Sequence, residues 1–229
     1  MTGSKSYAAP CVFSSKMSKF DGEILLDPTE YRHVVGALQY CTITRAEIAY
    51  SVNQLCQHMY NPTTTHWIAA KRVLRYLKGT LDHGLLYTRD SLQLTAYSDA
   101  DWASNPDDRK STTGFGIFLG SCLISWGYKK LAVVSQSSTE AGIRAMAITT
   151  TELYWIRMEK VINGDILDKF IPTERQVADL FTKGHTAARF LLLKDKLQVS
   201  PPPLSLKVNV RDKSQPESMH KMIAGSHAN

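Results

Sequence analysis

The chain has 229 residues, of which 43% are hydrophobic and 21% are charged. That length allows one large domain or two small ones, and the composition excludes a chain that is disordered throughout. The sequence has neither the apolar core of a signal peptide nor a run of about 18 apolar residues, so we expect an intracellular protein, cytoplasmic or nuclear, with no membrane partner. The formal net charge of +6 favours a polyanionic partner such as nucleic acid, although many basic proteins bind none.

The cysteines form no Cys-x-x-Cys pair, and no histidine stands at metal-ligand spacing from them. We therefore predict reduced and mostly buried thiols. The four residues are Cys11, Cys41, Cys56 and Cys122.

Residues 1–19 show no regular period and are interpreted as a leader or linker, and residues 20–89 as a helical segment. A first helix is predicted from Asp27, where Asp-Pro-Thr-Glu combines an N-cap, a proline at the first helical position and a glutamate that reaches back. A second capping box, Thr44-Arg45-Ala46-Glu47, predicts another helix that Asn61-Pro62 ends.

The third predicted helix carries Trp67 and Leu74 on its apolar face and stops at Gly79. Its other face is basic, which is usual for a solvated helix face but also suits contact with phosphates. The basic residues are Lys71, Arg72, Arg75 and Lys78.

From Leu92 the apolar period becomes alternating, which indicates strands. The first predicted strand leads from Leu92 into an acidic turn at Tyr97-Ser98-Asp99-Ala100-Asp101, and Lys129-Lys130 marks the connection after the third. The other predicted strands are Gly114 to Gly120, Cys122 to Trp126 and a short Leu131 to Val134.

Two helices and one strand are predicted after these strands. The first helix begins at Ser137-Ser138-Thr139-Glu140 and runs to about Met158, the strand covers Ile166 to Ile171, and the second helix runs from Thr173 to Lys183. This order predicts an α/β layer fold. The tail, residues 200–229, contains three consecutive prolines and is expected to be poorly ordered.

Three carboxylates stand at distinctive places in this pattern: Asp99 at the end of a strand, Glu140 in the first turn of a helix, and Asp179 inside the last helix. Acids in such separate segments suit two-metal phosphodiester cleavage if the fold brings them together. Each also has a structural interpretation: an Asx turn for Asp99, a capping box with Ser137 for Glu140, and a solvated helix position for Asp179.

The chain resembles copia-type retrotransposon polyproteins from about residue 20 to residue 206. The matching segments include DPTEYRHVVGALQY, AYSVNQLCQHMYNPT, HWIAAKRVLRYLKGTLDHGLLY, YSDADWAS, DDRKSTTGFGIFLGSCLISW, SSTEA and ADLFTKG. The resemblance implies that residues 20–89 are the C-terminal end of a reverse transcriptase, without its Tyr-x-Asp-Asp polymerase motif. It implies that residues 90–199 are a ribonuclease H domain, which cleaves RNA in RNA–DNA hybrids with Mg²⁺ or Mn²⁺ held by Asp99, Glu140 and Asp179.

The sequence departs from this family at two places. In the family, ELYWIRM leads to a strand with a further catalytic acid and then another helix, whereas here Met158 is followed directly by Glu159 and sequence from well beyond that point. Gly142 stands where the family typically has a glutamate, and it weakens the helix that presents Glu140. Neither Asp165 nor Asp168 is expected to replace the lost acid.

We therefore predict a ribonuclease H-like mixed sheet with flanking helices that lacks one central strand and one helix and follows an all-helical segment. Loss of that strand leaves sheet edges that either close on each other or stay unpaired, and both shift Asp179 relative to Asp99. The predicted function is that of a degenerate element with hydrolysis impaired.

Three alternatives remain open at this point. One is an active hybrid nuclease whose gap is compensated. Another is a non-catalytic module that binds nucleic acid through the basic helix and through Lys129 and Lys130. The last is a misannotated or unstable transposon fragment.

Overall fold

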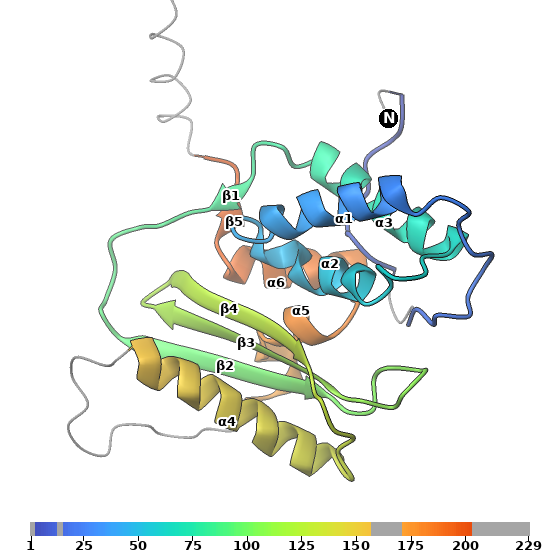
Figure 1. Cartoon of the computed structure of the whole chain (residues 1–229). Helices are drawn as coiled ribbons and strands as arrows, with labels where there is room; N and C mark the ends of the chain where they lie inside the picture. Colours follow the sequence, from blue (N-terminus) through green and yellow to red (C-terminus); the bar gives the residue numbers. More distant parts are fainter. Residues whose placement is uncertain (1–2, 13–15, 157–170, 203–229) are drawn as a thin grey trace, which may run out of the picture.

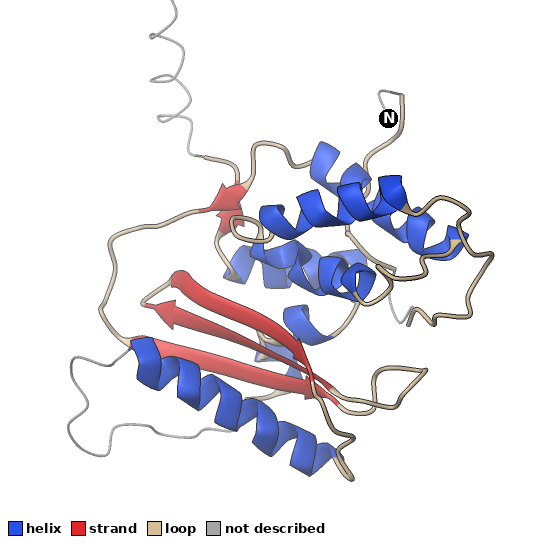
Figure 2. Ribbon diagram, viewed as in Figure 1, coloured by secondary structure: helices blue, strands red, loops and turns tan. Residues whose placement is uncertain are grey.

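The computed structural model describes residues 3–12, 16–156 and 171–202. A group of helices covers one face of a small sheet, and one long helix covers the other face (Figures 1 and 2). The first part of the chain forms α1 (Thr29–Cys41), the 3₁₀ turn η1 (Ala46–Ile48), α2 (Ala49–Cys56), α3 (Thr64–Lys78) and β1 (Gly84–Leu85). The rest forms β2 (Leu94–Asp101), β3 (Thr112–Leu119), β4 (Cys122–Lys130), α4 (Ser138–Ile156), η2 (Thr173–Arg175), α5 (Asp179–Thr182), α6 (Ala187–Lys196) and β5 (Val199–Ser200).

The three helices predicted before residue 89 are confirmed, but two of their starts differ from the prediction. Helix α1 begins one residue after Pro28, and the Asp27 carboxylate accepts a hydrogen bond from the Thr29 amide. The capping box predicted at Thr44 is wrong. The Thr44 hydroxyl donates back to the Cys41 carbonyl, and Glu47 is only 1% exposed, with its carboxylate in a buried ion pair with Arg45 at 2.7 Å.

Helix α3 has a capping box that was not predicted. The Thr63 hydroxyl accepts a hydrogen bond from the His66 amide, and the His66 ring accepts one from the Thr63 amide. Because this cap uses histidine at the third helical position in place of Glu or Gln, the usual pattern does not reveal it. Gly79 ends the helix as predicted.

The predicted hairpin strands are present and form an antiparallel sheet in the order β2-β3-β4. The acidic segment is not a turn, since Asp99 and Asp101 lie within β2 and pair in register with Gly114 and Thr112 of β3. Lys129 and Lys130 are likewise not a connection, because β4 continues through both of them. Residues 131–134 form no strand.

Glycines on β3 allow a close approach to the sheet on the face opposite α4. A Cβ atom added to Gly114 would lie 2.6 Å from the Cβ of Phe181 in α5, and one added to Gly116 would lie 3.2 Å from the Phe181 ring. Phe181 is fully buried there. The short helix α5 is therefore seated in a groove that only glycine leaves open.

The helix predicted from Thr173 to Lys183 is interrupted. It divides into η2 and α5, because Gln176 adopts an extended conformation between them. Helix α6, capped by the Thr186 hydroxyl, was not predicted, nor was the short antiparallel pairing of β1 with β5. The Tyr76 ring of α3 packs edge-on against Phe190 of α6, so one hydrophobic core continues across the boundary predicted at residue 90.

Within the described residues, no strand pairs with the outer edge of β2, and the described sheet is wholly antiparallel. The Gln176 side chain donates a hydrogen bond to the Ser98 carbonyl of β2. Several predictions fall outside the described residues: the junction at 158–159, the strand at 166–170, Asp165, Asp168 and the tail beyond residue 202. None of the described helices has the length and hydropathy required to cross a bilayer.

Candidate functional site

The fold brings together two of the three predicted catalytic acids, Asp99 of β2 and Asp179 of α5. A lysine joins them. The ammonium of Lys183 lies 3.2 Å from Oδ2 of Asp99 and 3.0 Å from Oδ1 of Asp179. The two carboxylates therefore share one cation that belongs to the chain itself.

The glycine groove on β3 explains why these residues meet. Asp99 is the register partner of Gly114, so its side chain points to the same face of the sheet that receives α5. The Thr182 hydroxyl donates a short hydrogen bond to Oδ2 of Asp99. A methyl group at Gly114 would lie 2.9 Å from Cγ2 of Thr182, so this contact depends on the glycine.

Asp179 is 3% exposed and has polar partners on several sides. Its second carboxylate oxygen lies 3.7 Å from the Arg189 guanidinium, and its backbone carbonyl is 3.0 Å from Nε2 of His185. Burial raises the pKa of Asp179, and Lys183 opposes that rise. Burial lowers the pKa of Lys183, but the two carboxylates outweigh this effect and hold that pKa above its ordinary value. The cluster is thus a compact arrangement of compensating charges.

Glu140 has separate partners. Its amide donates to the Ser137 hydroxyl at 3.1 Å, and its carboxylate accepts from the Gln136 amide at 2.8 Å. An ion pair with Arg144 one turn later, at 2.9 Å, completes its contacts. Those hydrogen bonds, first from Gln136 and then from Arg144, lower the pKa of Glu140. The Ser137 hydroxyl therefore caps the helix as predicted, whereas the Glu140 carboxylate binds the Gln136 amide in place of the Ser137 amide that a capping box requires.

The donor set at Asp99 and Asp179 does not fit a two-metal centre in this arrangement. Two divalent cations need several oxygen ligands, and the space between these carboxylates is taken by the Lys183 ammonium. Among residues 3–12, 16–156 and 171–202, no three His, Cys, Asp or Glu side chains gather at metal-binding spacing.

The predicted basic face of α3 is covered in part by residues 3–12, the first described part of the predicted leader. The Arg72 and Arg75 guanidinium groups lie against the Tyr7 ring, and the Lys78 ammonium donates to the Ser4 carbonyl. Lys71 is engaged differently, with its ammonium 4.8 Å from the centre of the Trp67 ring.

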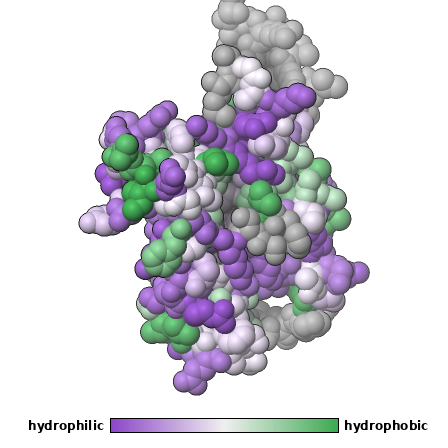
Figure 3. Space-filling model, turned by 90° about the vertical axis from the view of Figure 1, so that its right-hand side faces the viewer, coloured by the Kyte–Doolittle hydropathy of each residue, from purple (hydrophilic) through white to green (hydrophobic). Residues whose placement is uncertain are grey.

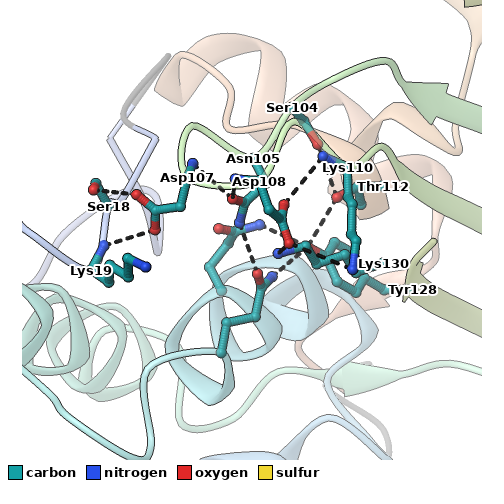
Figure 4. A network of polar contacts seen from close by, with 12 residues as sticks. Ser18, Lys19, Ser104, Asn105, Asp107, Asp108, Lys110, Thr112, Tyr128 and Lys130 are labelled. Carbon is teal, nitrogen blue, oxygen red and sulfur yellow. Dashed lines mark hydrogen bonds and ion pairs between the residues drawn. The ribbon is translucent and has the colours of Figure 1, made fainter. Parts of the chain in front are cut away.

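Lys129 and Lys130 do not form one basic patch, because neighbouring residues of a strand point to opposite faces. The Lys130 ammonium lies 2.9 Å from Asp108, and Lys129 is exposed. Figure 4 shows Lys130 and Asp108 beside Tyr128 in a network that joins the sheet to the helices. Gln54 of α2 donates to the Tyr128 hydroxyl at 2.7 Å. Lys130 is thus a structural residue at this contact.

Lys183 was not predicted as the partner of both acids. One signal for it was available, since Lys183 follows Asp179 by four residues, the spacing of an ion pair on a helix. Its second contact, with Asp99, depends on the docking of α5 and has no sequence signal.

Comparisons with known proteins point to retrotransposons. The chain is 50% identical over 157 residues to the "Retrovirus-related Pol polyprotein from transposon RE2" of Arabidopsis thaliana, covering 68% of this chain and 11% of that protein. It is 38% identical over 128 residues to the corresponding polyprotein from transposon TNT 1-94 of Nicotiana tabacum, covering 56% of this chain and 10% of that protein. The chain thus spans about a tenth of the length of these Pol polyproteins.

A shorter relative matches over most of its own length. The chain is 42% identical over 128 residues to "Secreted RxLR effector protein 161" of Plasmopara viticola, covering 55% of this chain and 90% of that protein. No family model matches the chain. No solved structure matches it either.

Proposed function

The chain is a relative of one segment of the Pol polyproteins of copia-type retrotransposons, and from this premise we propose that it is a ribonuclease H-like fragment that binds nucleic acid without hydrolysing it. Its ligand in this proposal is an RNA–DNA hybrid or another nucleic acid. The reverse-transcriptase origin of residues 20–89 and the ribonuclease H origin of residues 90–199 are parts of the same proposal.

The observation that carries the proposal is the Lys183 bridge between Asp99 and Asp179. An ammonium held by both carboxylates neutralises much of the negative charge that Mg²⁺ or Mn²⁺ would require. Glu140, the remaining predicted ligand, is held by its own helix terminus and by Arg144. Hydrolysis would therefore require these contacts to be exchanged for metal contacts.

Binding in this proposal is electrostatic. The formal net charge of +6 favours a polyanion, and each Lys or Arg that contacts a phosphate adds to the salt dependence of binding. The surface drawn in Figure 3 is mostly hydrophilic, and its hydrophobic residues stand in small separate groups. The described residues of this face therefore offer no broad apolar patch for a hydrophobic partner.

An active hybrid nuclease is the second candidate, and one specific observation favours it. Asp99 and Asp179 are far apart in sequence, yet the fold brings both of them to the same lysine, as a site that uses the two acids together would require. Exchange of Lys183 for metal ions would then be the first step in activating the site.

A cleavage and binding assay separates the two candidates. The full chain is incubated with an end-labelled RNA–DNA hybrid in Mg²⁺ and then in Mn²⁺, beside an Asp99→Asn variant. We expect salt-sensitive binding and intact RNA with both proteins. Metal-dependent cleavage that disappears in Asp99→Asn would establish the nuclease instead, and absence of both binding and cleavage would refute the proposed function.

A further inference from the structure

The leader lies along α3 and presents an aromatic ring to its basic side chains. The centre of the Tyr7 ring is 4.2 Å from the Arg72 guanidinium carbon and 3.9 Å from that of Arg75. Arg75 also donates to the Tyr7 hydroxyl at 3.0 Å. Guanidinium groups stack on nucleobases in the same manner as on aromatic side chains, so Tyr7 occupies a position suited to a base.

Backbone carbonyls of the same segment accept hydrogen bonds from two further donors of this face. Nε of Arg75 donates to the Lys5 carbonyl at 2.6 Å, and the Lys78 ammonium donates to the Ser4 carbonyl at 3.0 Å. These are the donors that would otherwise bind phosphate oxygens. Residues 4–7 therefore offer α3 oxygen acceptors beside a flat ring, which is what a nucleic-acid strand offers.

The segment is held at the end of α3 but packs loosely beside it. A Cβ atom added to Gly79 would lie 2.7 Å from Cβ of Ser6, which shows how closely the leader passes the helix terminus. A cavity of about 540 Å³ nevertheless remains between the leader, α2 and α3. Arg72 lines this space, and its Nε atom is buried with no hydrogen-bond partner among the residues that the structure describes. A ligand that accepts a hydrogen bond from this Nε–H group would therefore bind Arg72 more strongly than the leader does.

We propose that residues 4–7 are an intramolecular competitor for the basic face of α3, so that this face binds a nucleic-acid strand only when the leader is displaced. This inference rests on the proposed nucleic-acid binding. The apparent dissociation constant equals the intrinsic one divided by the fraction of molecules in which the leader is released. Any change that releases the leader must then tighten binding, and any change that holds it in place must weaken binding.

A reversible disulfide between the leader and α3 tests whether holding the leader in place weakens binding. Ser6→Cys with Gly79→Cys places two thiols where the leader passes α3, and the leader must move by about 1 Å to reach the usual Cβ separation of a disulfide. Gly79 has a φ of −81°, which any residue adopts. We expect the oxidised variant to bind a labelled single-stranded oligonucleotide at least tenfold more weakly than its own reduced form. Gly79→Cys alone should respond to oxidation by less than about twofold.

A substitution in the leader tests whether its release tightens binding. Tyr7→Ala removes both guanidinium stacks, which together correspond to about a tenfold change in affinity, and should tighten binding by that factor. Tyr40→Ala removes a tyrosine that is 79% exposed on α1 and serves as the matched control, with no change expected. Circular dichroism of each variant checks that its helices are intact.

The outcomes separate this inference from the proposed function. If the chain binds nucleic acid and neither Tyr7→Ala nor oxidation of the double-cysteine variant changes the affinity, then residues 4–7 are not a competitor, although nucleic-acid binding stands. Binding that survives Arg72→Gln with Arg75→Gln at full strength would place the ligand elsewhere and also overturn it. Failure of the wild type and of Tyr7→Ala to bind any strand would overturn both.

Discussion

Gly114→Ala tests whether the glycine groove on β3 seats α5 and thereby positions Lys183. The added methyl group would lie 2.6 Å from Cβ of Phe181, 2.9 Å from Cγ2 of Thr182 and 3.2 Å from the Phe181 carbonyl carbon. None of these atoms is the far end of a flexible side chain. The short helix must therefore move away from the sheet, taking Thr182 and Lys183 away from Asp99.

The expected cost follows from these distances. Overpacking of this kind destabilises by about 1–3 kcal/mol, and the lower entropy of alanine in the unfolded chain offsets about 0.5–1 kcal/mol of it. The net loss in the free energy of unfolding is then about 1–2 kcal/mol, measured by urea denaturation. Gly84→Ala is the matched strand control, because no atom lies within 4 Å of its added Cβ. Equal free energies of unfolding for the two variants would refute the claim that α5 needs glycine at position 114 to dock on the sheet.

Three further predictions concern stability. Gly142→Ala should stabilise α4 by about 0.5–1 kcal/mol in urea denaturation, since nothing lies within 4 Å of the added methyl group; a loss of stability would contradict the open position. Burial and the stacked His66 ring lower the pKa of His58 from 6.5 to about 4. Because the unfolded chain then protonates this ring more readily than the folded protein, the free energy of unfolding should fall by about 3 kcal/mol between pH 6.5 and pH 4. His58→Gln should make the free energy of unfolding less dependent on pH over that range, and an unchanged dependence would argue against a buried neutral ring. Glu47→Gln breaks the buried pair with Arg45 and should destabilise by about 3–5 kcal/mol, whereas the exposed control Glu30→Gln should stay within about 0.5 kcal/mol.

Local patterns were sufficient to predict most of the regular elements. Capping patterns located α1 and α4, because caps depend on neighbouring residues. Apolar spacing located α3 and the alternating period located β2, β3 and β4, because each of these elements buries one face against the core. Patterns also placed Glu140 correctly at a helix start, since capping depends on neighbours within four residues.

Features that depend on distant partners were not predictable in the same way. The segment around Asp99 has the composition of a turn, yet pairing with β3 extends the strand through Asp101. Glu47 matches a capping box, but burial beside Arg45 gives it a different partner. The Lys183 contact with Asp99 joins residues from α5 and β2, and it exists only because Gly114 lets those elements meet.

A manganese titration tests the central claim most directly. If Lys183 takes the place of a cation between Asp99 and Asp179, then paramagnetic Mn²⁺ should broaden no NMR signals selectively around these residues in the wild type. Lys183→Met should acquire saturable broadening there, because both carboxylates lose their shared cation. Saturable Mn²⁺ binding at Asp99 in the wild type, abolished by Asp99→Asn, would contradict the account.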